Sequence, residues 1–265
     1  MANDPSSDQK PIRPFVVGAV LIALLVGGFL LVRDLIAFGR PVPEFPSLAD
    51  DPDPSLHGTV AYFAMDEQEK TQVTGGCVRV VAAAGAPSRE VLCIDGRDHE
   101  VGPQLAFLPD GRLEVTMFSR SPDQPLVTAW QKIVDVRTGE TEDVPAAQLP
   151  EEPFGQGATV APTGEQISTD LQANTARLVL TDADGVSRTL WSADVPPDYR
   201  IGAIWAPNWE WILAYDGRLL VVTLDDPARI RVLASEAWAL GEYAGLEPPL
   251  VFYAITDADL LEATG

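Results

Sequence analysis

The chain has 265 residues and a formal net charge of −21, from 39 acidic and 18 basic side chains. A protein this acidic repels phosphate backbones and anionic lipid headgroups, so nucleic acid is excluded as a partner. The charge also favours solubility, which is its simpler interpretation. About 210 residues follow the first apolar segment, enough for one all-β domain with its own core.

The first element is the apolar segment Phe15–Val32, which contains no charged or polar side chain. As a helix it would reach about 27 Å, close to the hydrocarbon thickness of a bilayer. A cleaved signal peptide is the alternative. Its apolar core is usually shorter, about 7–15 residues, and here Arg33 and Asp34 precede the cleavage-like residues Ala37–Gly39. We therefore expect an uncleaved transmembrane helix over residues 14–32.

We infer the orientation of this helix from the lengths of the two segments that flank it, residues 1–13 before it and the large domain after it. The basic residues before and after the helix balance, so the positive-inside rule does not decide. Because residues 1–13 are too few to fold, we expect a cytoplasmic tail there and an extracytoplasmic domain on the other side. Ala19, Ala23 and Gly27 recur every four residues and predict a helix-association face, although membrane helices are rich in small residues in any case.

Residues 33–56 are expected to form a stalk rich in proline and aspartate. Residues 40–54 contain five prolines and four acidic residues, and proline favours extended chain while removing amide donors. With no apolar face to bury, this segment would lift the domain off the bilayer. Asp50, Asp51 and Asp53 lack the glycine-bearing loop and distal glutamate of a calcium site, so no metal is assigned to them.

From residue 57 to residue 265 the sequence predicts many short strands separated by turns. Three segments repeat an apolar strand followed by a turn that carries proline: Leu105–Gly111, Ala158–Gly164 and Ala203–Trp209. Each continues with three further strands, and four strands in about 40–50 residues is the period of a β-propeller blade. The first unit lacks its first strand, which Leu250–Ile255 at the end of the chain is expected to supply.

Short turn motifs relate these repeats to a known family. The turn Pro109–Gly111 has degenerate copies at Pro162–Gly164 and Pro207–Trp209, and Val134–Gly139 carries a Val-Asp-x-x-Thr-Gly turn. In these motifs the region resembles the blades of TolB-like and related WD-repeat propellers. The resemblance implies a reduced β-propeller of about four four-stranded blades, fewer than the usual six. A β-sandwich is the alternative fold.

Cys77 and Cys93 are the only cysteines. A hairpin that turns near Gly85 places them opposite each other, with Arg79 opposite Val91, at a spacing that a cross-strand disulfide can use. The cysteines fall on the less apolar face of the hairpin, which favours a disulfide over the alternative of two buried thiols. A disulfide implies an oxidising, extracytoplasmic compartment.

The sequence assigns no catalytic residue, cofactor or metal site. His57 and His99 lie in loops, and neither a Gly-x-Ser-x-Gly elbow, a phosphate-binding glycine loop nor a metal-spaced histidine pair is present. Trp205, Trp209 and Trp211 gather at one blade junction. They predict either an aromatic interaction surface or, the preferred interpretation, core packing between blades.

We therefore expect a single-pass membrane protein whose extracytoplasmic propeller-like domain acts in protein interaction or sensing. Its partners would be the bilayer, through residues 14–32, and another envelope or membrane protein. The alternatives are an accessory subunit of a larger membrane complex and a cell-envelope hydrolase. The hydrolase is less favoured because no acid–base pair can be nominated.

Overall fold

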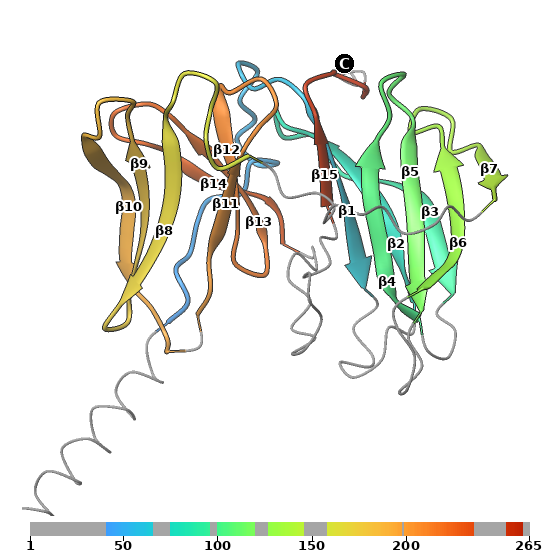
Figure 1. The fold of residues 1–265 in the computed structure, drawn as a ribbon, viewed down its shortest axis with the longest axis horizontal. Helices are drawn as coiled ribbons and strands as arrows, with labels where there is room; N and C mark the ends of the chain where they lie inside the picture. The colour runs from blue at the N-terminus through green and yellow to red at the C-terminus, as the bar shows by residue number, and fades with distance from the viewer. Residues whose placement is uncertain are drawn as a thin grey trace, which may run out of the picture.

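The computed structural model describes residues 41–65, 75–95, 100–119, 127–145, 158–197, 199–235 and 253–261. Within these ranges the regular elements are β-strands, which form four antiparallel sheets (Figure 1). The predicted transmembrane helix and its association face, Ala19, Ala23 and Gly27, lie outside the described residues. In the part of the chain that is described, no helix has the length and apolar character needed to cross a bilayer.

Each sheet corresponds to one predicted repeat, and we number the sheets blade 1 to blade 4 in chain order. Blade 1 contains, in spatial order, β15 (Tyr253–Thr256), β1 (Thr59–Met65), β2 (Gly75–Ala82) and β3 (Arg89–Asp95). Blade 2 contains β4 (Glu100–Phe107), β5 (Leu113–Ser119), β6 (Val127–Val134) and β7 (Thr141–Val144). Blade 3 contains β8 (Gln166–Gln172), β9 (Thr175–Thr181) and β10 (Ser187–Asp194). Blade 4 contains β11 (Gly202–Trp205), β12 (Trp211–Tyr215), β13 (Leu219–Thr223) and β14 (Ile230–Ala234).

The last strand of the described residues completes the first sheet, as the sequence predicted. β15 pairs with β1 in antiparallel register, from Thr59 opposite Thr256 to Tyr62 opposite Tyr253. This pairing covers the edge of β1, so the N-terminal sheet does not offer that edge to another chain. The described architecture is all-β and propeller-like.

Blade 3 differs from the prediction because it has three strands instead of four. The expected first strand, residues 158–161, makes only an isolated bridge between Val160 and Gln166. The reason is that this segment is shared between two sheets. The backbone N–H of Ile167 in β8 donates to the carbonyl of Thr159 at 2.8 Å, and the backbone N–H of Trp205 in β11 donates to the carbonyl of Ala158 at 3.0 Å. It therefore links blade 3 to blade 4 instead of forming a full ladder.

Three hydrophobic clusters hold the blades together in the spatial order 2-1-4-3. One joins blades 1 and 2 through side chains such as Phe63 and Met117. A second joins blades 1 and 4 through Tyr62 and Trp211. The third joins blades 3 and 4 through Leu178, among others. Within the described ranges no hydrophobic cluster contains residues of both blade 2 and blade 3, and Figure 1 shows these two blades at opposite ends of the long axis.

The two end sheets carry polar side chains on the faces that point away from their neighbouring blades. On blade 3 these include Gln166, Ser168, Asp170, Arg177 and Ser192. On blade 2 they include Gln104, Glu114, Thr116, Gln131 and Glu142. On this face of blade 2, however, Gln104, Thr116 and Phe118 are buried.

The linker does not behave as a free stalk over residues 41–56. Leu48 is fully buried and Leu56 is 6% exposed, both in the cluster between blades 1 and 4. Backbone hydrogen bonds of 2.8 Å join Leu48 N to Val232 O and Val232 N to Pro46 O, so the linker pairs with β14 in an isolated parallel bridge between Ser47 and Val232. The sequence shows no apolar face in this segment, but two leucines among many prolines are enough to anchor it.

Candidate functional site

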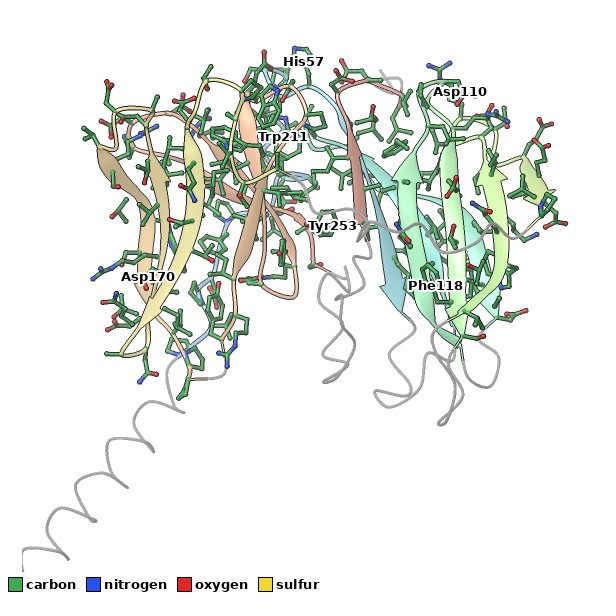
Figure 2. All side chains as sticks on the ribbon, in the orientation of Figure 1. His57, Asp110, Phe118, Asp170, Trp211 and Tyr253 are labelled. Carbon is green, nitrogen blue, oxygen red and sulfur yellow. A yellow bond between two sulfur atoms is a disulfide. The ribbon has the colours of Figure 1, made fainter. Side chains whose placement is uncertain are left out.

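The repeated proline turns lie at one end of the blades, which we call the rim. In each copy the third residue of the turn donates its backbone N–H three residues back: Gly111 to Leu108, Gly164 to Ala161 and Trp209 to Ala206, at 2.8–2.9 Å. Figure 2 shows His57 and Asp110 at this upper end and Phe118 and Asp170 toward the opposite end. A hairpin turn also lies at Asp182–Gly185, where the Asp182 carboxylate accepts hydrogen bonds from the backbone N–H groups of Asp184 and Val186.

At the rim, hydrogen bonds join residues 57–59, at the start of β1, to residues 258–260, after β15, and we call this set of contacts the clasp. Asp259 accepts a 2.7 Å hydrogen bond from the backbone N–H of Gly58 and lies 3.0 Å from Nδ1 of His57. The Thr59 hydroxyl donates to the carbonyl of Ala258 and accepts from the N–H of Leu260. The bond from Gly58, with a smaller contribution from His57, lowers the pKa of Asp259 below its ordinary value. Local spacing could not reveal this pair, because His57 and Asp259 are 202 positions apart.

The His57–Asp259 pair lacks the rest of a catalytic triad. Both side chains are more than half exposed. Among the described residues no serine, threonine or cysteine side chain hydrogen-bonds to the His57 ring, so the nucleophile that such a pair would activate is missing there. The pair instead closes blade 1. His99, the other histidine, lies outside the described residues.

Because of the clasp, we expect the free energy of unfolding of the domain to fall in acid. Because the folded pKa of Asp259 is depressed, its stabilising contribution is present above pH 3.8 and is lost as the pH falls through the folded pKa. We expect Asp259→Asn to lower the free energy of unfolding at pH 7, and the difference from the wild type to shrink below about pH 4. Urea unfolding between pH 3 and 7 measures this, with Asp257→Asn, an exposed neighbour, as the control for net charge. An unchanged difference across that range would contradict the role of the Asp259 charge.

The three tryptophans do not form one aromatic surface. Trp211 is fully buried and Trp205 nearly so, and the Trp211 indole N–H donates a 3.0 Å bond to the carbonyl of His57. Trp209 lies in the turn before β12, with a φ of 62°. Its half-buried ring packs 6.2 Å from that of Trp205. Core packing, the preferred interpretation, holds for Trp205 and Trp211, and only Trp209 remains a candidate for contact with a partner.

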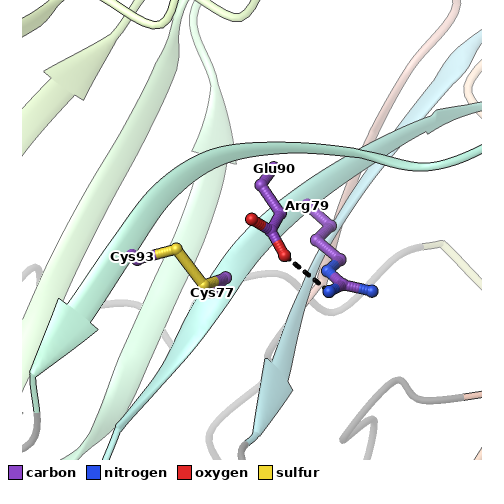
Figure 3. The surroundings of a disulfide bond; sticks show 4 residues. All are labelled: Cys77, Arg79, Glu90 and Cys93. Atoms are coloured by element: carbon purple, nitrogen blue, oxygen red, sulfur yellow. Dashed lines mark hydrogen bonds and ion pairs between the residues drawn. A yellow bond between two sulfur atoms is a disulfide. The ribbon is translucent and has the colours of Figure 1, made fainter.

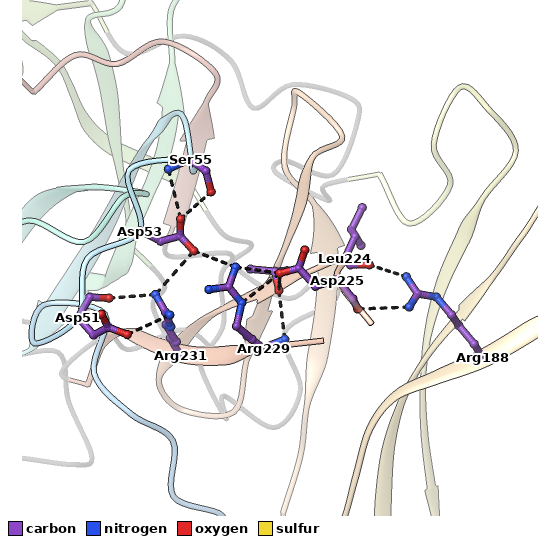
Figure 4. A network of polar contacts seen from close by, with 9 residues as sticks. Asp51, Asp53, Ser55, Arg188, Leu224, Asp225, Arg229 and Arg231 are labelled. Carbon is purple, nitrogen blue, oxygen red and sulfur yellow. Dashed lines mark hydrogen bonds and ion pairs between the residues drawn. The ribbon is translucent and has the colours of Figure 1, made fainter. Parts of the chain in front are cut away.

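The linker aspartates pair with arginines of β14 and of the turn before it (Figure 4). Asp51 lies 3.0 Å from Arg231, and Oδ2 of Asp53 lies 3.1 Å from Arg229 and 3.7 Å from Arg231. A 2.5 Å hydrogen bond from the Ser55 hydroxyl is the main reason why the pKa of Asp53 is lowered, and the two arginines lower it further. These carboxylates therefore fasten the linker to blade 4.

The same network continues to blade 3. Arg229 also binds Asp225 through two nitrogens at 2.8 and 3.0 Å. From β10 of blade 3, Arg188 donates to the carbonyl of Leu224 at 2.8 Å (Figure 4). Polar contacts thus run without a break from the linker across blade 4 to blade 3. The exposed pairs of this network, such as Arg229 with Asp225, contribute little singly.

The start of the linker is held at the opposite end of the blades. The Arg218 guanidinium donates to the carbonyl of Pro43 at 3.0 Å, lies 5.3 Å from the centre of the Phe45 ring and pairs with Asp216. Asp216 also accepts a 2.8 Å bond from the hydroxyl of Tyr199, whose pKa is raised mainly by burial. In Figure 1 the blue segment accordingly runs from the lower edge of blade 4 up to the rim.

Cys77 and Cys93 form the predicted disulfide and are directly opposed in the register of β2 and β3 (Figure 3). Cys93 is exposed and Cys77 partly so. The predicted register holds as far as Val78, but Arg79 lies opposite Glu90 instead of Val91. A β-bulge between Val78 and Arg79 causes the difference.

Loss of the disulfide should destabilise the domain. The two cysteines are 16 residues apart, and closing a loop of that size in the unfolded chain is worth about 3 kcal/mol in chain entropy. We expect the Cys77→Ser/Cys93→Ser double variant to lose about 2–4 kcal/mol in urea unfolding. The oxidised wild type is the reference, and wild type treated with a dithiol should match the variant. Equal stability of the oxidised and reduced wild type would contradict the prediction.

Comparisons with known proteins were made for the sequence and for the fold. No protein-family model and no curated protein matches the sequence. The fold is similar to TolB from Acinetobacter baumannii, at 16% identity and a TM-score of 0.24, over 66% of this chain and 41% of that one. It is also similar to a protein from Lactobacillus plantarum, at 8% identity and a TM-score of 0.17, over 68% and 67% of the two chains. At these values neither likeness bears on the activity of this chain.

Proposed function

We propose that the chain is a single-pass membrane protein whose propeller-like domain lies outside the cytoplasm and binds another envelope or membrane protein. The observation that carries the proposal is the Cys77–Cys93 disulfide, because such bonds persist in oxidising compartments. The apolar segment Phe15–Val32 supports the anchor, since its length and lack of charge fit a bilayer.

Under this proposal the linker sets which surface meets a partner. Residues 33–40 separate the apolar segment from the docked linker, and eight residues span at most about 29 Å. The lower edge of blade 4, where Arg218 holds Pro43, would then lie close to the bilayer. The rim, with the half-buried Trp209, would face away from it and be open to a partner.

Cysteine labelling on intact cells tests the topology. Val186, in a rim turn and 66% exposed, offers a position for a single accessible thiol, because the native cysteines are joined to each other. We expect a membrane-impermeant maleimide to label Val186→Cys on intact cells and to label Ser6→Cys only after permeabilisation. The reverse pattern would place the domain in the cytoplasm, and a soluble product that begins near residue 40 would remove the anchor.

Site-specific photo-crosslinking tests the interaction. A photoreactive side chain at Val186 samples the rim, and one at Leu171, 41% exposed near the far end of β8, is the matched control. We expect a crosslinked protein of defined mass from the rim position and none from Leu171. No product at either position, from a chain that is monomeric in mild detergent, would contradict a protein-binding role.

A further inference from the structure

The face of blade 1 that carries the disulfide also carries a carboxylate. In a regular hairpin Glu90 would lie on the face opposite to the cysteines, but the bulge beside Val78 shifts the register by one residue. As a result Glu90 and Arg79 lie on the same face as Cys77 and Cys93. Bulges of this kind often re-aim a side chain next to a functional site.

These side chains bring three metal-ligand atoms together. Sγ of Cys77, Sγ of Cys93 and a carboxylate oxygen of Glu90 all lie within 4.8 Å of one another. Two thiolates and a carboxylate on tetrahedral zinc stand about 3.5–3.8 Å apart, because the Zn–S and Zn–O bonds are about 2.3 and 2.1 Å long. Little movement of β2 and β3 is therefore needed for all three atoms to contact one ion. Cys93 and Glu90 are exposed, so the ion can enter from solvent.

We propose that Cys77, Cys93 and Glu90 form a binding site for a thiophilic divalent cation, such as Zn²⁺, when the disulfide is reduced. A dithiol reductant supplies the two electrons and becomes a disulfide itself, while the Cys77–Cys93 bond breaks and each sulfur takes up a proton. On binding the cation both thiols release these protons and bind as thiolates, with water in the fourth position.

The charges of the site fit a divalent cation. Two thiolates and one carboxylate carry three negative charges, which a divalent ion and the Arg79 guanidinium together neutralise. Arg79 lies 2.6 Å from one oxygen of Glu90, and in Figure 3 the Glu90 carboxylate lies between Arg79 and the disulfide. Arg79 therefore holds the carboxylate in place before the ion binds. The site forms only when this disulfide is reduced, whereas the proposed extracytoplasmic location rests on the oxidised protein, so the titration below tests the site and not the location.

Cobalt titration of the reduced full chain tests the proposal. The protein, in mild detergent, is reduced with a dithiol, freed of reductant by anaerobic gel filtration and titrated with Co²⁺, whose bonds to thiolates absorb in the near ultraviolet. We expect one equivalent to bind to the reduced protein, none to the oxidised protein, and Zn²⁺ to displace the cobalt. Binding to the reduced wild type no tighter than to the Cys77→Ser/Cys93→Ser variant would overturn the proposal.

Substitutions distinguish the proposed metal ligands from glutamates that do not bind the ion. We expect Glu90→Gln to weaken cobalt binding about tenfold or more, as loss of a residue from a metal site commonly does. Glu142→Gln, which removes an exposed strand glutamate that also pairs with an arginine, is the matched control and should bind as the wild type does. Equal affinity in Glu90→Gln would overturn the three-ligand site. If reduction abolishes the near-ultraviolet circular dichroism, one equivalent of Zn²⁺ should restore it, and failure to do so also overturns the proposal.

Discussion

Replacement of Trp211 by alanine should lower the free energy of unfolding by about 3–5 kcal/mol. Trp211 is fully buried in the cluster that joins blades 1 and 4, so the substitution leaves a large cavity at that junction. It also removes the indole N–H that donates to the carbonyl of His57, next to the clasp of the C-terminus. One side chain thus contributes both to the contact between two sheets and to the closure of blade 1.

Trp209→Ala is the matched control for this prediction. Trp209 is only partly buried and occupies a turn, so its loss should cost clearly less than the loss of Trp211. Urea unfolding of the full chain in mild detergent, followed by circular dichroism, gives both values. Equal losses for the two variants would mean that the junction between blades 1 and 4 is not where the structure places it.

Repetition made most of the fold predictable from the sequence. A strand followed by a proline turn occurs three times, and turns of this kind depend on neighbouring residues only. The closure of blade 1 was also predictable, because a unit without its first strand and an unpaired strand at the end of the chain complement each other. The disulfide followed from the register of one hairpin. All of these signals are local or repeat at a fixed period.

What the sequence did not predict depends on contacts between distant segments. The His57–Asp259 pair joins residues 202 positions apart and has no local pattern. The bulge that moves Glu90 to the cysteine face shifts one residue without a proline or a special glycine to mark it. The docking of the linker was hidden by its composition, since five prolines suggest an extended chain while only tertiary contacts show what Leu48 packs against.

The linker should therefore act as part of the domain. Leu48 is fully buried in the cluster between blades 1 and 4, and Gly85 lies directly against it. Gly85 has a φ of 90°, and a Cβ built there would lie 2.4 Å from the carbonyl oxygen of Leu48. The turn at Gly85 therefore packs directly against Leu48, and a smaller side chain at position 48 loses close contacts and leaves a cavity.

We expect Leu48→Ala to lower the free energy of unfolding by about 2–5 kcal/mol, as for other fully buried leucines. Val42→Ala, in the same linker but at a side chain that is 50% exposed, should change it by less than about 0.5 kcal/mol. Urea unfolding and limited proteolysis of the full chain check both, and Leu48→Ala should also speed cleavage between residues 41 and 56. A free, semi-rigid stalk would give the opposite result, with both variants as stable as the wild type, because neither side chain would then be buried against the sheets.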